Sequence, residues 1–137
     1  MKYVLDTNTF SALMKGEHAV VDRLASAGRA NVAVPQPVLA EIAYGIARLP
    51  ASRRRAMLTT RADLLTRELA RVAWTDDVSE AFGHIKASLE RQGERIEDMD
   101  VAVAAHAVAT DAVLVTAGRH HMPRVPGLSV ENWRDSI

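Results

Sequence analysis

The stretch Tyr3-Val4-Leu5-Asp6-Thr7-Asn8 decides how the rest of the chain is interpreted, because a short apolar run stops there at an acid and two polar residues. This pattern is typical of a buried strand that brings a carboxylate to one edge of a sheet, where open α/β sheets hold their chemistry. An aspartate at this place can also simply cap the helix that follows. Thr7 and Asn8 carry donors that could fix the carboxylate in one orientation, which a cap alone does not require.

Apolar runs alternate with helical patterns along the whole chain. Strands are expected at residues 2–5, 32–34, 72–74 and 113–116, with an edge strand near 125–130. Helices are expected at residues 9–14, 19–27, 38–47, 51–70, 78–92 and 99–110. The alternation predicts an α/β fold, with a central, mainly parallel sheet of four or five strands between helical layers. A single domain over residues 1–137 is expected at this length.

Two helices carry more specific expectations. The helix at 99–110 is apolar nearly all round, so it should lie between the sheet and another layer, with His106 as a satisfied core histidine rather than a ligand. The helix at 51–70 is expected to bury one apolar side, formed by Met57, Leu58, Leu64, Leu65 and Leu69.

Composition excludes several classes of function. The chain has no cysteine, which removes disulfides, thiolate metal sites and thiol nucleophiles. No apolar stretch is long enough to span a membrane, and the first residues lack a secretory pattern, so a cytoplasmic protein without membrane contact is expected. Seventeen basic residues balance seventeen acidic ones, so no net field steers the whole molecule toward nucleic acid.

Three acids stand in places that suggest chemistry: Asp6, Glu41 and Asp100. Glu41 lies at the rim of an apolar helix face, where a carboxylate is costly unless it binds a ligand or pairs with a base such as Arg48. Asp100 heads the apolar helix, at its positive end. Because the carboxyl ends of parallel strands share an edge, the three could meet there and hold Mg²⁺ or Mn²⁺ for phosphoryl chemistry. Asp98 could belong to this set or only favour the helix dipole.

Positive charge gathers between Arg48 and Arg71, where seven arginines face only Asp63 and Glu68. Arginine suits phosphate contacts, so Arg53, Arg54 and Arg61 are candidates for binding RNA or a partner protein. The alternative is a solvated helix face.

Several motifs together resemble PIN-domain ribonucleases, most closely the VapC toxin branch. They are Leu5-Asp6-Thr7-Asn8, the run from Leu39 through Glu41 to Tyr44-Gly45, the run from Gly93 through Ile96 and Asp100 to Ala107, and the tail from Arg124 to Trp133. The resemblance implies that Asp6, Glu41 and Asp100 bind metal, with Asn8 and Thr116 as supporting groups. It further implies Mg²⁺-dependent cleavage of structured RNA such as tRNA or rRNA, a homodimer, and a small VapB-like antitoxin. The arginine-rich helix would then grip RNA or antitoxin.

One departure from the family pattern follows the fourth strand. Gly118 stands where an asparagine or aspartate is expected, and His121 stands where a later acid is expected. The fourth acid is thus missing, and Asp98 could partly replace it. His120 and His121 could instead contact a metal or the scissile phosphate, and manganese would tolerate a histidine better than magnesium. Their alternative is an exposed polar loop.

The sequence therefore predicts a metal-dependent endoribonuclease toxin. Two alternatives stay open: a PIN-like module that binds RNA or antitoxin without cutting, and a doubly wound phosphatase that uses Asp6 as a nucleophile. Asn8, in place of a second aspartate two residues after Asp6, argues against the phosphatase.

Overall fold

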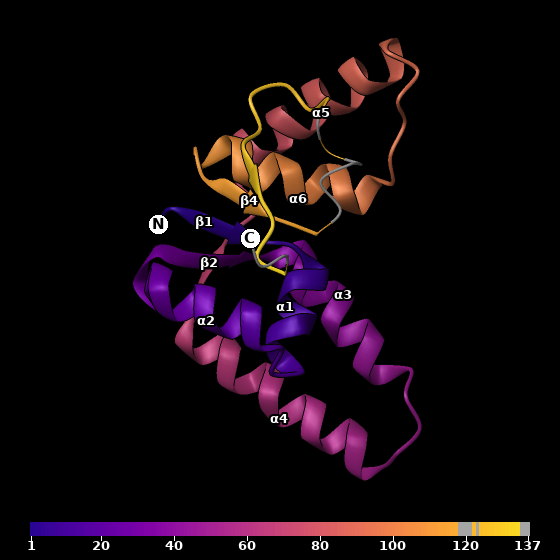
Figure 1. Ribbon diagram of the computed structural model, residues 1–137. Coiled ribbons are helices and arrows are strands. Elements are labelled where there is room, and N and C mark those ends of the chain that lie inside the picture. The colour runs from indigo at the N-terminus through magenta and orange to yellow at the C-terminus, as the bar shows by residue number, and fades with distance from the viewer. Residues whose placement is uncertain (118–121, 123, 135–137) are drawn as a thin grey trace.

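The protein was analysed as a computed structural model, which describes residues 1–117, 122 and 124–134. Its centre is a five-stranded parallel sheet in the order β3-β2-β1-β4-β5 (Figure 1). The strands are β1 (Tyr3–Leu5), β2 (Val32–Pro35), β3 (Ala70–Val72), β4 (Val113–Val115) and β5 (Val130–Glu131). They pair in parallel throughout, with Tyr3 opposite Val32 on one side and Val113 on the other. The predicted fold class is confirmed.

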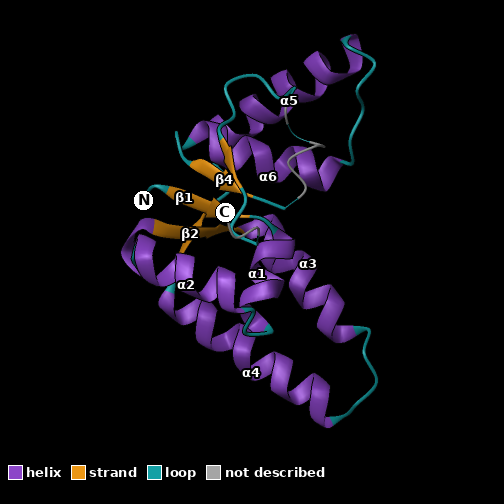
Figure 2. Cartoon of the chain, in the orientation of Figure 1, coloured by secondary structure: helices purple, strands orange, loops and turns teal. Residues whose placement is uncertain are grey.

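Helices cover both faces of this sheet (Figures 1 and 2). One face carries α1 (Thr7–Met14), α2 (His18–Ala27), α3 (Gln36–Ala47) and α4 (Arg53–Glu68), and the other carries α5 (Asp76–Arg91) and α6 (Asp98–Ala109). A short 3₁₀ turn, η1 (Arg29–Asn31), leads into β2. Right-handed crossovers explain the division, because the chain steps from β1 to β2 to β3 in one direction and then returns past β1 to β4.

The core lies where the sheet meets α1 and α6. Strands covered on both faces must be apolar without alternation, and Val4, Leu5, Val32, Ala33 and Val34 are all buried. Helix α6 is buried from Val101 to Ala107, as its all-round apolar pattern predicts. No helix in the described part of the chain combines the length and the apolar character that crossing a bilayer requires.

The third strand lies two residues earlier than predicted, at 70–72 instead of 72–74. Helix α4 ends at Glu68, and β3 pairs with β2 from Ala70 onward, so the strand is complete before Trp74. Trp74 leaves the sheet, is 47% exposed, and packs edge-on against His106 with 5.3 Å between ring centroids. Trp74 therefore packs on His106 as a residue of the loop after β3 and is not part of the strand.

The predicted buried side of α4 is partly wrong. Leu58 and Leu69 are buried and Leu65 is half-buried, whereas Met57 and Leu64 are 44% and 50% exposed. Helix α4 packs on α1 and α3 along one narrow stripe, which includes Leu58 and Ala62. The other two apolar residues lie on a neighbouring stripe that faces away from this contact.

His106 only partly meets the expectation of a satisfied core histidine. Its side chain is fully buried, and Nδ1 lies 2.7 Å from the Ala102 carbonyl oxygen, so Nδ1–H donates to that oxygen. Nε2 has no partner among the described residues. Burial lowers the pKa of His106 below its ordinary value of 6.5, and the bond to Ala102 opposes this shift only in part.

We expect His106 to make the fold sensitive to acid. The unfolded chain binds a proton near pH 6.5, while the folded His106 stays neutral to lower pH, so stability falls as pH drops from 6.5 toward the folded pKa. The slope from this residue is at most about 1.4 kcal/mol per pH unit. The free energy of unfolding, measured with urea at pH 5 to 8, should fall less steeply with decreasing pH for His106→Leu than for wild type. Equal slopes would contradict the assignment.

Candidate active site

The candidate site lies where the strand order reverses, between the carboxyl ends of β1 and β4. Open α/β sheets bind ligands at such a reversal, because the loops that follow the two strands separate there. Asp6 follows β1 and Thr116 follows β4. The Val115 carbonyl accepts from the Asp6 backbone N–H at 3.0 Å and from Thr9 Oγ1 at 3.1 Å. The two strand ends are therefore joined beneath the site.

Asp6 is half-buried and caps helix α1. Its Oδ1 accepts a 2.8 Å hydrogen bond from the Thr9 backbone N–H, so the capping alternative is correct as far as Oδ1 is concerned. Among the described residues no hydrogen bond is made to Oδ2. The cap thus fixes the carboxylate in one orientation and leaves its second oxygen for a ligand.

Glu41 is held by a residue from another helix. Thr7 Oγ1, in the first turn of α1, donates a 2.6 Å hydrogen bond to Glu41 Oε1 on α3. The expected alternative, a pair with Arg48, is wrong, because the Arg48 guanidinium lies over the Tyr44 ring with its Cζ 5.9 Å from the centroid. Sequence reasoning assigned Thr7 to Asp6 and missed its bond to Glu41, which no pattern within either helix indicates.

Asp100 lies in the first turn of α6 and is half-buried. It lines an open hollow of about 560 Å³ together with Arg95, Ile96 and Glu97. Asp98 is exposed, and its Oδ1 lies 3.0 Å from Lys86 Nζ on α5. Asp98 thus has a structural partner, whereas its role as a metal ligand stays a prediction.

The predicted metal ligands, Asp6, Glu41 and Asp100, all offer the carboxylate oxygens that Mg²⁺ binds. Within the described residues, no three acidic or histidine side chains come close enough together to enclose an ion. Glu41 bonds to Thr7, the residue that follows Asp6 in the chain, while Asp100 lines a separate hollow. Mg²⁺ needs only one or two carboxylates, because it keeps several waters and binds phosphate oxygens. Half-buried carboxylates held by hydrogen bonds fit such a hydrated ion.

The two predicted supporting residues, Asn8 and Thr116, differ in their exposure to solvent. Asn8 is exposed and lines a cleft of about 270 Å³ that Glu41 also lines. Thr116 is buried, and its backbone N–H donates to the Glu131 carbonyl on β5 at 2.9 Å. Gly118, His120 and His121 lie outside the described residues.

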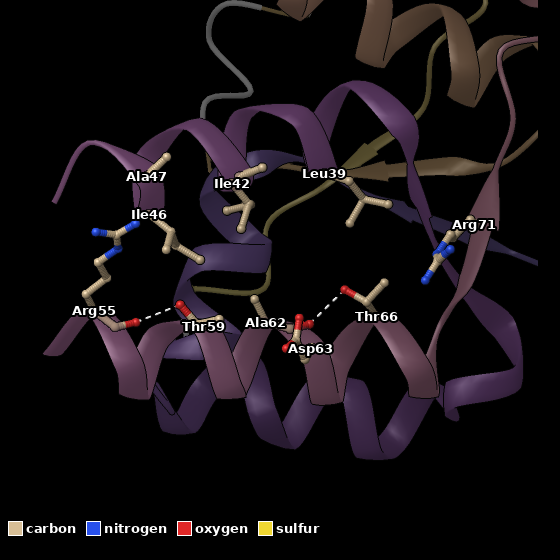
Figure 3. Close-up of a pocket in the computed structure, with 11 residues that line it drawn as sticks. Leu39, Ile42, Ile46, Ala47, Arg55, Thr59, Ala62, Asp63, Thr66 and Arg71 are labelled. Atoms are coloured by element: carbon tan, nitrogen blue, oxygen red, sulfur yellow. Dashed lines mark hydrogen bonds between the residues drawn. The ribbon is translucent and has the colours of Figure 1, made fainter. Parts of the chain in front are cut away.

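A third depression, of about 480 Å³, runs between α3 and α4 (Figure 3). Its α3 side is apolar, with Leu39, Ile42 and Ile46 pointing toward α4 (Figure 3). The α4 side adds Ala62 and a polar rim that includes Arg55 and Asp63, and Arg71 lies at one end. We call this depression the α3–α4 groove.

The three candidate arginines of α4 are not equivalent. Arg53 is exposed at the first residue of the helix, and Arg54 lines the 270 Å³ cleft. Arg61 donates from Nη1 to the Met14 carbonyl oxygen at 2.8 Å, at the end of α1. A cation at a helix C-terminus is favourable, so Arg61 has a structural task.

Comparisons with known proteins agree with the predicted family. The family model described as "PIN domain" matches residues 3–128. Ribonuclease VapC2 from Rickettsia felis is 30% identical over 97% of this chain and 98% of its own. The tRNA(fMet)-specific endonuclease VapC from Shigella flexneri is 27% identical with the same coverage. These matches confirm the resemblance that the motifs predict.

Solved structures agree as well. The crystal structure of VapBC2 from Rickettsia felis, bound to a DNA fragment from its promoter, has a chain 28% identical, with a TM-score of 0.87 over 97% of this chain and 99% of that chain. The DNA-bound VapBC structure from Salmonella typhimurium, 24% identical with a TM-score of 0.88 over 97% of this chain and 98% of that chain, supports the fold alone.

Replacing Arg61 should destabilise the fold, while replacing Arg53 should not. Arg61→Ala removes the bond to Met14, at an expected cost of about 1 kcal/mol in the free energy of unfolding. Arg53→Ala, on the same helix, should change it by less than about 0.5 kcal/mol. Urea denaturation at pH 7 measures both values. If the two variants are equally stable, Arg61 has no structural task.

Proposed function

Because this chain belongs to the PIN domain family, we propose that it is a cytoplasmic, metal-dependent endoribonuclease toxin that hydrolyses phosphodiester bonds in structured RNA. The ribonuclease part of this proposal is supported by relatives that align over nearly the whole chain. The observation that carries it is a pair of hydrogen bonds from α1, which hold Asp6 at the end of β1 and Glu41 on α3. A tRNA substrate is favoured by the relative whose name states one.

Asp6, Glu41 and Asp100 are the residues that we expect to hold a divalent ion, Mg²⁺ or Mn²⁺. When bound, such an ion would make water a nucleophile and offset charge on the phosphate. The protein's own contribution is positioning. The Thr9 N–H fixes Asp6, Thr7 fixes Glu41, and the start of α6 holds Asp100 on a rigid, buried helix. Asn8 and Thr116 would support this arrangement from the same edge.

A VapB-like antitoxin is part of the proposal, because the Rickettsia relative was solved as a VapBC complex. The α3–α4 groove suits the apolar side of a partner segment, with Arg55 and Arg71 available to acidic or carbonyl groups. A homodimer is included as well, since the exposed Met57 and Leu64 leave an apolar stripe on α4.

We expect Asp100→Asn to abolish RNA cleavage, while Asp98→Asn keeps it within a few-fold of wild type. A lost ligand should cost at least about a hundredfold, since loss of a residue that only supports a ligand costs about 10–100-fold. The assay follows fragments from a mixed tRNA and rRNA pool, using antitoxin-free protein with Mg²⁺, with Mn²⁺ or with chelator.

Both variants should unfold at the same temperature as wild type, which separates chemistry from folding. Discrete fragments that vanish with chelator and with Asp100→Asn would support the nuclease. Intact RNA in every lane, from folded protein that still binds antitoxin, would favour the non-cleaving module. A comparable loss in Asp98→Asn would make Asp98 a ligand and not merely the partner of Lys86.

The α3–α4 groove can be blocked without disturbing the core. Ala43 is exposed and lines the groove, so Ala43→Arg should weaken binding of the co-expressed cognate antitoxin at least about tenfold. Ala40 is also exposed on α3 but does not line the groove, so Ala40→Arg serves as the control. Titration calorimetry measures both affinities. Equal affinities would exclude the groove as the antitoxin site.

A further inference from the structure

The segment of α3 beyond Glu41 carries a side chain that neither the fold nor the metal site uses. Tyr44 is 68% exposed, the highest exposure among the large hydrophobic residues in the described part of the chain. It lies three residues after Glu41 and four before Arg48, so the three side chains share one side of the helix. The Arg48 guanidinium lies over its ring and puts a positive charge beside it.

The cleft next to this tyrosine is basic. Lys15, Arg48 and Arg54 line it, together with Glu41 and Asn8. Within the described residues, none of these three cationic groups forms an ion pair or donates a side-chain hydrogen bond. Only some of the other described arginines are paired with glutamates, namely Arg23, Arg29, Arg124 and Arg134. The cleft therefore holds positive charge that the fold leaves for an anionic ligand.

Gly45 gives an independent indication at the same place. It lies inside α3 and lines the cleft, although glycine in a helix interior costs stability relative to alanine. A Cβ atom added to Gly45 would meet no atom within 4 Å, and its backbone is not in the left-handed region. The fold therefore does not require a glycine here. An absent side chain instead lets a ligand approach the helix backbone closely.

We propose that Tyr44, Gly45 and Arg48 form a platform for an unpaired nucleobase of the RNA substrate, an inference that rests on the proposed function. The base stacks on the Tyr44 ring and passes over Gly45, while Lys15 and Arg54 contact the phosphates on the way to Glu41. A base inside a duplex cannot reach an aromatic ring in this way, so the platform selects single-stranded segments. Cleavage would then fall in a loop or bulge.

The first test is RNA binding in the presence of chelator, which prevents turnover. The probes are a fluorescein-labelled 12-nucleotide RNA without self-pairing and a hairpin that pairs the same sequence. Tyr44→Ala should weaken binding of the single-stranded probe by about five- to a hundredfold, and Tyr44→Phe by less than about twofold, because phenylalanine keeps the aromatic face. Neither variant should change binding of the hairpin stem.

Two matched glycine variants separate ligand approach from folding. Gly83 lies inside α5, and a Cβ added there also meets nothing, but Gly83 is remote in sequence from the cleft and does not line it. Gly45→Ala and Gly83→Ala should each raise the melting temperature by about 3 °C. Only Gly45→Ala should weaken binding of the single-stranded probe.

The outcomes distinguish this inference from the proposed function. If wild type cleaves the RNA pool but Tyr44→Ala and Gly45→Ala bind the single-stranded probe normally, the platform is wrong and the nuclease stands. If wild type neither binds RNA nor cleaves it, the proposed function fails and the platform fails with it. If Tyr44→Ala binds RNA normally but loses the co-expressed antitoxin, the exposed ring belongs to a protein interface.

Discussion

The Val115 carbonyl oxygen accepts two hydrogen bonds from the chain that leaves β1, one from the Asp6 N–H and one from Thr9 Oγ1. These bonds join the ends of the two central strands at the place where the strand order reverses. They also set the start of α1, and α1 in turn supplies the donors that hold Asp6 and Glu41. A buried hydroxyl and a backbone amide therefore orient the carboxylates from below.

Much of this arrangement could be predicted, because it follows from patterns that are local in sequence. The short apolar run before Asp6 indicates a buried strand, and the all-round apolar character of α6 indicates its buried place. What failed depends on packing between elements. Met57 and Leu64 are apolar but face away from α1 and α3, and Trp74 packs on His106 after β3 has ended. The bond from Thr7 to Glu41 depends on how two helices lie against each other, which neither helix encodes alone.

Charge in this molecule is organised locally rather than globally. Equal numbers of acidic and basic residues leave no net charge, and several surface arginines are paired with glutamates. Arg61 bonds to the Met14 carbonyl at the end of α1, so not every arginine of the cluster in the sequence is available to bind a ligand. Among the cations that stay available, Lys15, Arg48 and Arg54 line the cleft beside Glu41, where they act over short distances that salt screens little.

The parallel pairing of β1 with β4 joins Tyr3 to Val113, so the two strands that frame the site come from opposite ends of the sequence. Closing so long a loop is entropically costly, and contacts of this kind form slowly during folding. The edge between Asp6 and Thr116 is therefore complete only after the chain has returned across the sheet. A partly folded chain in which β4 has not yet paired with β1 lacks this edge, even if its helices have formed. The proposed site therefore exists only in the completely folded chain.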